Sequence, residues 1–253
     1  MDLGLKNKTA LVTGASRGIG FAVAQCLAAE NCNLHLVATD RLRLESAKET
    51  IEKTSNINIS TQAIDLSIES ELPKLSDKLN EADVLINNAG AIPRGGLEDI
   101  DDKTLRKAWE LKLFGYINLS RMAFSLMKER RSGVILNIIG AAARNPTYNY
   151  IAGSVANVAL ENFTIAMGKE STKHGVRVLG VHPAITDTDR MVGHYEKTAE
   201  KNFGDKNRWR EVLPTLPFDR PTTPQEVANL VTFLVSEKAS YSSGIVIDVT
   251  GGV

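Results

Sequence analysis

The stretch that decides the fold is LVTGASRGIGFAVAQCLAAE, residues 11–30. A short apolar run over residues 9–13 leads directly into Gly14, Gly18 and Gly20, and an apolar helical stretch follows over residues 21–30. Glycines between a strand and a helix permit a tight turn and let backbone N–H groups approach a ligand, and the positive end of the helix favours negative charge there. The stretch therefore predicts a strand–turn–helix unit that can hold a pyrophosphate.

Short apolar, β-branched runs recur along the rest of the chain. They cover residues 9–13, 33–38, 58–64, 83–87, 133–139, 176–182 and 244–250. Nearly continuous apolarity is typical of parallel strands that are covered on both faces, and helical stretches lie between most of these runs. The alternation predicts an α/β fold, a single-domain Rossmann-type doubly wound parallel sheet of about seven strands with helices on both faces.

One of the helical stretches carries its own start signal. Residues 223–236 open with Thr223 as an N-cap, Pro224 at the first helical position and Glu226 three residues after the cap. A capping threonine and a glutamate at this spacing satisfy each other's free backbone N–H groups. We therefore expect a capping box at Thr223.

Composition excludes several classes of protein. The chain has 253 residues, and its 30 basic residues balance 30 acidic ones, so net charge favours neither nucleic acid nor a membrane surface. Cys26 and Cys32 are too few for a disulfide framework, which predicts a reducing, cytoplasmic location. No apolar run reaches the roughly 18 residues of a membrane span, and the first residues lack the layout of a signal peptide. The expected partner is a small molecule.

Further motifs identify a family. NNAG, residues 87–90, follows the fourth apolar run, AIDLS, residues 63–67, follows the third, and residues 220–252 close the chain with RPTTPQEVANLVTFLVS and YSSGIVIDVTGG. Together with the spacing Gly-x-x-x-Gly-x-Gly, these motifs resemble the short-chain dehydrogenase/reductase family over essentially the whole chain. The resemblance implies a nicotinamide dinucleotide cofactor and hydride transfer between a carbonyl compound and its alcohol.

The resemblance also implies which residues hold the cofactor. The glycine turn would cradle the dinucleotide, the residues after the third run would hold the adenine, NNAG would line the adenosine ribose, and the turn after the sixth run would hold the nicotinamide amide. In that order, these residues are Gly14, Ser16, Gly18, Ile19 and Gly20; Asp65 and Leu66; Asn88, Ala89 and Gly90; and Pro183, Ile185 and Thr188. Ala184 stands where the family usually has glycine.

The choice between the two nicotinamide cofactors depends on the end of the second run. NAD-binding proteins usually carry an acid there for the ribose hydroxyls, and this chain has Ala38 followed by Thr39 and Asp40. Arg17 lies where the family commonly places a cation for the additional 2′-phosphate, and an arginine fork suits a phosphate. These residues favour NADP(H). NAD(H) stays possible, because a shift of two residues would make Asp40 the ribose acid.

The family's catalytic residues are largely replaced. Its members use a tyrosine as acid or base, a serine that holds the substrate oxygen, a lysine that supports the tyrosine and binds the ribose, and an asparagine in a proton relay. The resemblance puts Tyr150 at the tyrosine, Gly140 at the serine, Ser154 at the lysine and Lys112 at the asparagine. The interval from Gly140 to Tyr150 is short for the family, so a shift of a few residues stays open, with Tyr148 as the rival tyrosine.

Lys112 is the informative position. It lies within an apolar stripe of helical periodicity over residues 105–126, where a buried ammonium is costly unless it is paired or hydrogen-bonded. A free tyrosine has a pKa near ~10, and a desolvated ammonium close by favours its ionised form. Our hypothesis is that Lys112 points at Tyr150 and partly replaces the missing lysine; the alternative is a chance feature of packing.

Residues 189–218 interrupt the alternation of strands and helices. They are polar, with two prolines and scattered aromatic residues, and we expect a lid that covers a substrate. His194 lies in this segment and His182 precedes Pro183, so both are candidates for contact with substrate. Relatives commonly pair through the helices that carry Lys112 and Tyr150, which implies a homodimer or homotetramer.

Three functions remain open at this point. The first is an NAD(P)-dependent oxidoreductase that reduces a carbonyl, or oxidises the corresponding alcohol, with Tyr150 as acid or base. The second is a dinucleotide-binding protein without turnover, acting as a redox sensor or structural subunit. The third, less favoured, is other cofactor-dependent chemistry such as isomerisation or dehydration. Fold does not choose between them, because function depends on the site.

Overall fold

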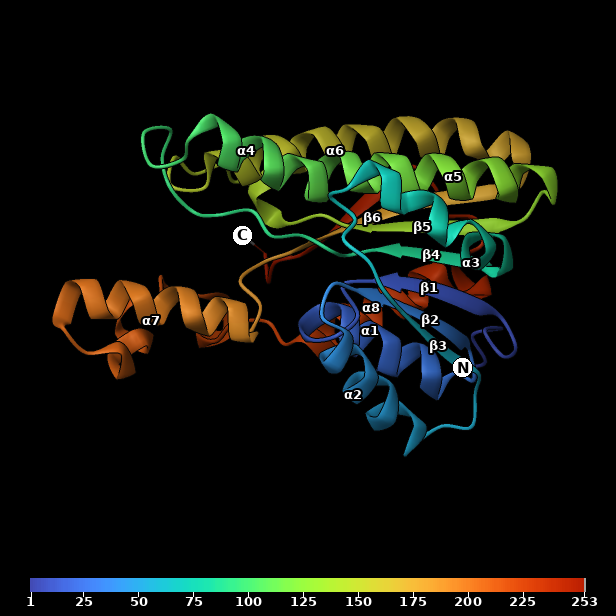
Figure 1. Ribbon diagram of the computed structural model, residues 1–253, viewed down its shortest axis with the longest axis horizontal. Coiled ribbons are helices and arrows are strands. Elements are labelled where there is room, and N and C mark those ends of the chain that lie inside the picture. The colour runs from blue at the N-terminus through green and yellow to red at the C-terminus, as the bar shows by residue number, and fades with distance from the viewer. Residues whose placement is uncertain (253) are drawn as a thin grey trace.

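The computed structural model describes residues 1–252, and its centre is a parallel sheet of seven strands in the order β3-β2-β1-β4-β5-β6-β7 (Figure 1). The order reverses between β1 and β4, and this is where open α/β sheets bind ligands at the carboxyl ends of their strands. The strands are β1 (Thr9–Thr13), β2 (Asn33–Ala38), β3 (Ile59–Ala63), β4 (Val84–Asn87), β5 (Gly133–Ile138), β6 (Val176–Pro183) and β7 (Ile245–Val249).

Helices cover both faces of the sheet (Figure 1). One layer holds α1 (Gly18–Ala29), α2 (Arg41–Glu52) and α8 (Pro224–Val235). The other holds α3 (Ser76–Glu81), α4 (Asp102–Trp109), α5 (Gly115–Glu129) and α6 (Ile151–Ser171). A π-helical turn, η2 (Glu110–Phe114), joins α4 to α5, and short 3₁₀ turns are η1 (Glu69–Leu75), η3 (Ala141–Ala143), η4 (Thr172–His174), η5 (Lys206–Val212), η6 (Pro217–Asp219) and η7 (Glu237–Ala239).

The predicted doubly wound α/β fold is confirmed, and every predicted strand lies within one residue of its observed bounds. The capping box is confirmed too. The Thr223 side chain accepts from Glu226 N, and the Glu226 side chain accepts from Thr223 N at 2.8 Å. Both predictions rested on local sequence signals. For the strands, tertiary packing reinforces the signal, because the apolar runs fill the interior of the sheet.

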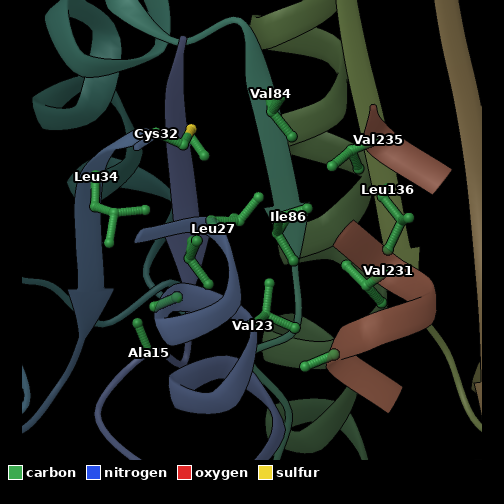
Figure 2. Packing of buried hydrophobic residues seen from close by; sticks show 14 of the residues in the cluster. Ala15, Val23, Leu27, Cys32, Leu34, Val84, Ile86, Leu136, Val231 and Val235 are labelled. Carbon is green, nitrogen blue, oxygen red and sulfur yellow. The ribbon is translucent and has the colours of Figure 1, made fainter. Parts of the chain in front are cut away.

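The larger core lies between the sheet and the layer of α1 and α8 (Figure 2). Val23 and Leu27 of α1 and Val231 of α8 pack against Ile86 of β4 and Leu136 of β5, and all five side chains are buried. Burying an aliphatic side chain of this size contributes about 1.5–3 kcal/mol. This packing fixes α1, and with it the glycine turn that precedes α1.

A buried polar ladder ties the opposite helical layer to the sheet. Asn87 Nδ2 of β4 donates to Asn137 Oδ1 of β5 at 2.9 Å and to Ser120 Oγ of α5 at 3.0 Å. Asn137 Nδ2 in turn donates to Thr164 Oγ1 of α6 at 2.9 Å. Since buried amides without partners are costly, the ladder sets the position of α5 and α6 along the strands.

The segment expected as a lid differs from its prediction in secondary structure. Residues 189–203 form a 15-residue helix, α7 (Asp189–Phe203), capped by the Thr188 side chain. The helix extends away from the sheet and its two helical layers (Figure 1). Met191, Tyr195 and Ala199 are its buried residues, and this spacing of four defines one apolar side. The polar composition had hidden this narrow stripe.

Residues 1–252 contain neither a membrane-spanning helix nor a cluster of metal-binding side chains. No helix in that range is both long enough and apolar enough to cross a bilayer. The same residues contain no group of three or more His, Cys, Asp or Glu side chains arranged for a metal ion.

The polar ladder predicts a specific loss of stability. Replacing Asn137 by alanine removes one partner from Asn87 and one from Thr164, so we expect the free energy of unfolding to fall by about 1–3 kcal/mol in urea denaturation. The control is Asn162→Ala on the exposed side of α6, which should change it by less than about 0.5 kcal/mol. Equal effects of the two substitutions would contradict the role of the ladder.

Candidate active site

The glycine turn has the shape that a phosphate site requires. Gly14 and Gly18 adopt positive φ angles of 65° and 59°, which favour glycine. A Cβ at Gly14 would lie 2.7 Å from Asn88 Nδ2, and one at Gly20 would overlap both Asn88 Nδ2 and the carbonyl oxygen of Gly14. Gly14 and Gly20 therefore keep the turn and the start of α1 closely packed against the loop after β4.

Asn88 locks this turn to β4. Its side-chain Nδ2 donates to Thr13 O at 3.0 Å and to Gly14 O at 3.2 Å, and its backbone N–H donates to Thr13 Oγ1 at 2.9 Å. Ala89 N also donates to Thr13 Oγ1, at 3.1 Å. The switch point between β1 and β4 is thus held rigid by groups of the NNAG motif.

The other predicted cofactor residues lie along the same edge of the sheet. Asp65 uses Oδ1 to accept from the backbone N–H and hydroxyl of Ser67, which leaves Oδ2 for a further donor, and Leu66 is buried beside it. Thr188 Cγ2 would be 3.3 Å from a Cβ at Gly18, so the turn after β6 comes close to the glycine turn. Ile185 O accepts from Thr222 N at 3.0 Å, which anchors that turn.

The acid that follows β2, Asp40, is engaged by its neighbours, whereas Arg17 in the glycine turn is exposed. Asp40 caps α2: its Oδ1 accepts from Arg43 N at 3.1 Å, and its Oδ2 lies 3.3 Å from Arg43 Nε. Ala38 ends the strand, Thr39 is exposed, and Arg17 is exposed directly before α1. The carboxylate that could have bound ribose hydroxyls is therefore engaged in the helix cap.

Tyr150 is the N-cap of α6, and its backbone pairs with Gly95 in a parallel bridge. Its ring occupies the space into which a side chain at position 153 would project, because a Cβ at Gly153 would overlap Cε1 and Cζ of the ring. Residue 153 being glycine thus lets the phenol lie along the first turn of α6. The rival Tyr148 is exposed and donates to Glu98 Oε2.

Gly140 is constrained by Asn157, which the sequence analysis did not select. Gly140 has φ 140° and ψ 141°, and a Cβ there would lie 2.8 Å from Asn157 Nδ2. Asn157 is buried, its Nδ2 donates to Gly140 O at 3.4 Å, and its Oδ1 has no protein partner. The space beside Gly140, the position that the sequence analysis matches to the family's serine, is therefore taken by an amide from the second turn of α6.

Ser154 does not share this arrangement. Its hydroxyl is buried and has no hydrogen-bond partner among residues 1–252. Ser154 and Asn157 are three residues apart on α6, and of these two side chains only that of Asn157 is hydrogen-bonded to Gly140. The structure thus brings Asn157, and not Ser154, against Gly140.

Lys112 lies in the π-helical turn η2, and its side chain is buried although it bears an ammonium. Nζ donates to Ile138 O at 2.7 Å and to Tyr116 Oη at 2.9 Å, and the alkyl stem packs on Gly90, where a Cβ would lie 2.8 Å from Cδ. Lys112 therefore has different hydrogen-bond partners from the Tyr150 phenol we had expected. The reason is that the π turn directs it at the end of β5.

Electrostatics at this position are unusual. Burial, and then the neighbouring Arg190, lowers the pKa of Lys112 from 10.5 to about 7. Burial, and then the proximity of Tyr150, raises the pKa of Tyr116 well above its ordinary value. Tyr116 Oη also donates to Ile138 O at 3.1 Å. Lys112, Tyr116 and Tyr150 therefore form one neighbourhood, with Tyr116 as the hydrogen-bonded neighbour of the lysine.

Two arginines complete the surroundings of Tyr150, and neither was selected from the sequence. The guanidinium carbon of Arg94 lies 5.2 Å from the centroid of the Tyr150 ring. Arg190, at the start of α7, donates to Gly90 O at 2.8 Å and to Ile92 O at 2.6 Å. Arg190 thus connects the expected lid to the loop after β4.

The candidate histidines have separate surroundings. His182 is fully buried, its Nε2 lies 3.3 Å from Glu161 Oε2, and Arg144 bonds to Glu161 at 3.0 Å and approaches Asp248 at 3.3 Å. Burial lowers the pKa of His182, although Glu161 and Asp248 oppose that shift. His194 is on α7, where burial, and then Arg94, lowers its pKa. His194 accordingly shares the surroundings of Tyr150's arginines, and His182 is the buried member of a cluster of charged side chains near the ends of β6 and β7.

The fold and this edge of the sheet define a dinucleotide-binding α/β protein, and known proteins identify the family. The family model for short chain dehydrogenases matches residues 8–199. The "NADPH-dependent reductase BacG" of Bacillus subtilis is 32% identical over 257 aligned residues, covering 98% of each chain. "3-oxoacyl-[acyl-carrier-protein] reductase FabG" of Escherichia coli is 30% identical, covering 99% of each.

Solved structures of similar proteins point to the same family. L-sorbose reductase from Gluconobacter frateurii, complexed with NADPH and L-sorbose, superposes with a TM-score of 0.92 at 28% identity, covering 99% of this chain and 98% of that one. YwfH, an NADPH-dependent reductase involved in bacilysin biosynthesis, has a TM-score of 0.90 at 30% identity, with 98% of each chain covered. The chain therefore belongs to the short-chain dehydrogenase family.

The buried ammonium predicts a pH dependence of stability. Between the folded pKa of Lys112, about 7, and the ordinary 10.5, only the unfolded chain binds the proton, so stability must rise with pH in that window by up to about 1.4 kcal/mol per unit. Lys112→Met removes this contribution. We expect the variant's advantage over the parent in urea denaturation to be largest near pH 7 and to shrink toward pH 10.

Lys107→Met is the control for this experiment, because Lys107 is an exposed lysine of α4, one and a half turns away. Its stability curve should follow that of the parent at every pH. A Lys112→Met curve parallel to the parent from pH 7 to 10 would contradict the assignment.

Proposed function

We propose that the protein is an NADPH-dependent reductase that converts a carbonyl compound to the corresponding alcohol, with Tyr150 as the proton donor. One observation carries the proposal: an intact dinucleotide cradle and a partly buried tyrosine lie at the same edge of the sheet, the cradle after β1 and β4 and the tyrosine at the start of α6. Relatives named as NADPH-dependent reductases support it.

The residues present fit the cofactor. Gly14, Gly18 and Gly20 leave no side chain between the turn and an approaching pyrophosphate, and the start of α1 supplies free backbone N–H groups. Asp65 would hold the adenine amine, and Arg17 with Thr39 would face the 2′-phosphate. Because Asp40 is engaged with Arg43, the phosphorylated cofactor is the better match.

When bound, NADPH would supply a hydride to the carbonyl carbon of the substrate. Tyr150 Oη donates its proton to the carbonyl oxygen as the carbon–oxygen double bond becomes a single bond, and water returns a proton to the phenolate. A protonated phenol donates a proton to a carbonyl oxygen, whereas oxidation of an alcohol requires a proton acceptor, so this role suits Tyr150 to the reductive direction. General acid catalysis of this kind contributes about 10²–10⁴-fold.

In this proposal Lys112 acts on Tyr150 through Tyr116 and not by direct contact. With a pKa of about 7, Lys112 carries a proton part of the time at neutral pH, and its hydrogen bond to Tyr116 Oη aligns that phenol. Lys112 therefore orients and polarises the neighbourhood of Tyr150 and is a positioning residue. The backbone N–H groups of Gly140 and Ala141 take the place of the missing serine as donors to the substrate oxygen.

A specific observation keeps the second function in view. The lysine of the family is absent from α6, Asn157 and Ser154 both leave a buried oxygen without a partner, and no ammonium is hydrogen-bonded to Tyr150 within residues 1–252. These features suit a protein that binds the dinucleotide and reports its redox state without turnover. One measurement distinguishes the reductase from the redox sensor, namely whether a carbonyl compound oxidises bound NADPH.

Tyr150→Phe tests the proposed proton donor. We expect single-turnover oxidation of bound NADPH by a panel of ketones and oxo acids to slow by at least about 10²-fold, with unchanged affinity for NADPH by fluorescence titration. Tyr148→Phe is the control and should retain the parental rate. No turnover in the parent protein would favour the sensor function, and a Tyr150→Phe rate equal to the parent's would exclude Tyr150 as the donor.

Arg17→Ala tests the cofactor preference. Loss of a guanidinium from a 2′-phosphate should raise the dissociation constant of NADPH by about 10-fold or more, and that of NADH by less than about 3-fold. Arg121→Ala on α5, remote from the turn, should change neither. Equal losses for the two cofactors would remove Arg17 from the 2′-phosphate site.

A further inference from the structure

Cations gather around Tyr150 without carboxylate partners. Arg94 lies over the Tyr150 ring, Arg190 bonds to the loop that Lys112 packs against, and both arginines act on His194 of α7. Among residues 1–252, no carboxylate lies within 4.0 Å of the charged groups of Arg94, Arg190 or Lys112. The surroundings of the proposed proton donor are therefore positively charged.

The acids in the adjacent loop are engaged elsewhere. Glu98 Oε2 accepts from the hydroxyl of Tyr148, and Asp99 Oδ2 accepts from Gly96 N at 2.8 Å. The remaining arginines of the α7 segment differ from Arg190, because Arg208 is paired with Glu211 and Arg210 stacks on Trp209. Arg210 also has no carboxylate within 4.0 Å, so Arg94 and Arg190 are distinguished by their place, Arg94 over the Tyr150 ring and Arg190 on the loop after β4.

Arg94 and Arg190 both have N–H groups that make no hydrogen bond to protein among residues 1–252. A guanidinium carries five N–H groups, and Arg190 uses one of them on Gly90 O and one on Ile92 O. Arg94 makes no hydrogen bond to protein among residues 1–252, and it is exposed. Planar forks with free N–H pairs are suited to a carboxylate or phosphate, which they hold in two parallel bonds.

We propose that the substrate is anionic, a carbonyl compound that bears a carboxylate or phosphate group within a few bonds of the carbonyl, and that Arg94 and Arg190 bind this group. The inference rests on the proposed reductase function and adds the substrate class. Arg94 holds the anion beside the Tyr150 ring, so that the carbonyl oxygen meets the phenol. Arg190 adds a second contact from α7, and its two bonds to the loop after β4 keep that end of the helix over the site.

Binding without turnover is the first test. The NADPH-loaded protein is titrated with 3-phenylpropanoate and with its uncharged amide, 3-phenylpropanamide, by calorimetry at low and at physiological salt. We expect the acid to bind at least about 10-fold more tightly, with a difference that narrows as salt rises. The preference should fall below about 3-fold in Arg94→Gln and in the double variant Arg94→Gln/Arg190→Gln. Arg210→Gln, on the same segment, should keep it.

Turnover is the second test, and it separates the two proposals. The pair is 4-phenyl-2-oxobutanoate and its amide, compared with dihydroxyacetone phosphate and dihydroxyacetone to distinguish carboxylate from phosphate. We expect kcat/KM to favour the charged member of at least one pair by about 10-fold or more, and to lose this preference in the arginine variants. Acid-selective binding without turnover would support the anion site and overturn the reductase function. Turnover that does not depend on the charge of the substrate would support the reductase function and overturn the anion site.

Arg190 has one competing assignment, the phosphates of the cofactor. A rise of 10-fold or more in the dissociation constant of NADPH in Arg190→Gln, with an unchanged ratio of acid to amide binding, would overturn the substrate role of Arg190. Equal binding of acid and amide to the parent protein would overturn the proposal as a whole.

Discussion

The structure depends on the contact between the glycine turn and the loop after β4. Asn88 bonds through one amide to both Thr13 and Gly14, and Gly14 and Gly20 leave no Cβ in its way. If this contact were loosened, β1 and β4 could still pair, but the turn would lose its fixed position relative to NNAG. A cofactor must bridge these two segments. The geometry of the carboxyl edge of the sheet at this point therefore depends on the Asn88 amide and on the absence of a Cβ at Gly14 and Gly20.

The second constraint is the burial of Lys112. Burying an ammonium is unfavourable unless it is hydrogen-bonded, and the structure meets this requirement with a strand carbonyl and a tyrosine hydroxyl. The π turn gives Lys112 its direction, and π turns often occur at functional sites. A residue that costs stability and lies beside the proposed proton donor is more readily explained by function than by packing, which links the electrostatics of the site to the irregular helix.

Sequence reasoning located the strands to within a residue because their signal is local: a short apolar run between turn residues describes a buried parallel strand. It also located the glycine turn and NNAG. It did not find Asn157 or the partners of Lys112. Asn157 meets Gly140 across the loop before α6, between residues 17 positions apart in the sequence. Such contacts depend on three-dimensional register, and a bond to a strand carbonyl has no sequence signal. The helix α7 was missed because its apolar stripe is narrow.

The close fit of Asn157 against Gly140 has a consequence for how this site could have diverged. A serine at position 140 requires a Cβ where the Asn157 amide now lies, and a φ angle that side chains seldom adopt. A side chain therefore cannot enter position 140 without strain while Asn157 keeps its present place, so the effect of a substitution at position 140 depends on residue 157. A single Gly140→Ser substitution meets the Asn157 amide, and installing a serine there takes a second change at residue 157.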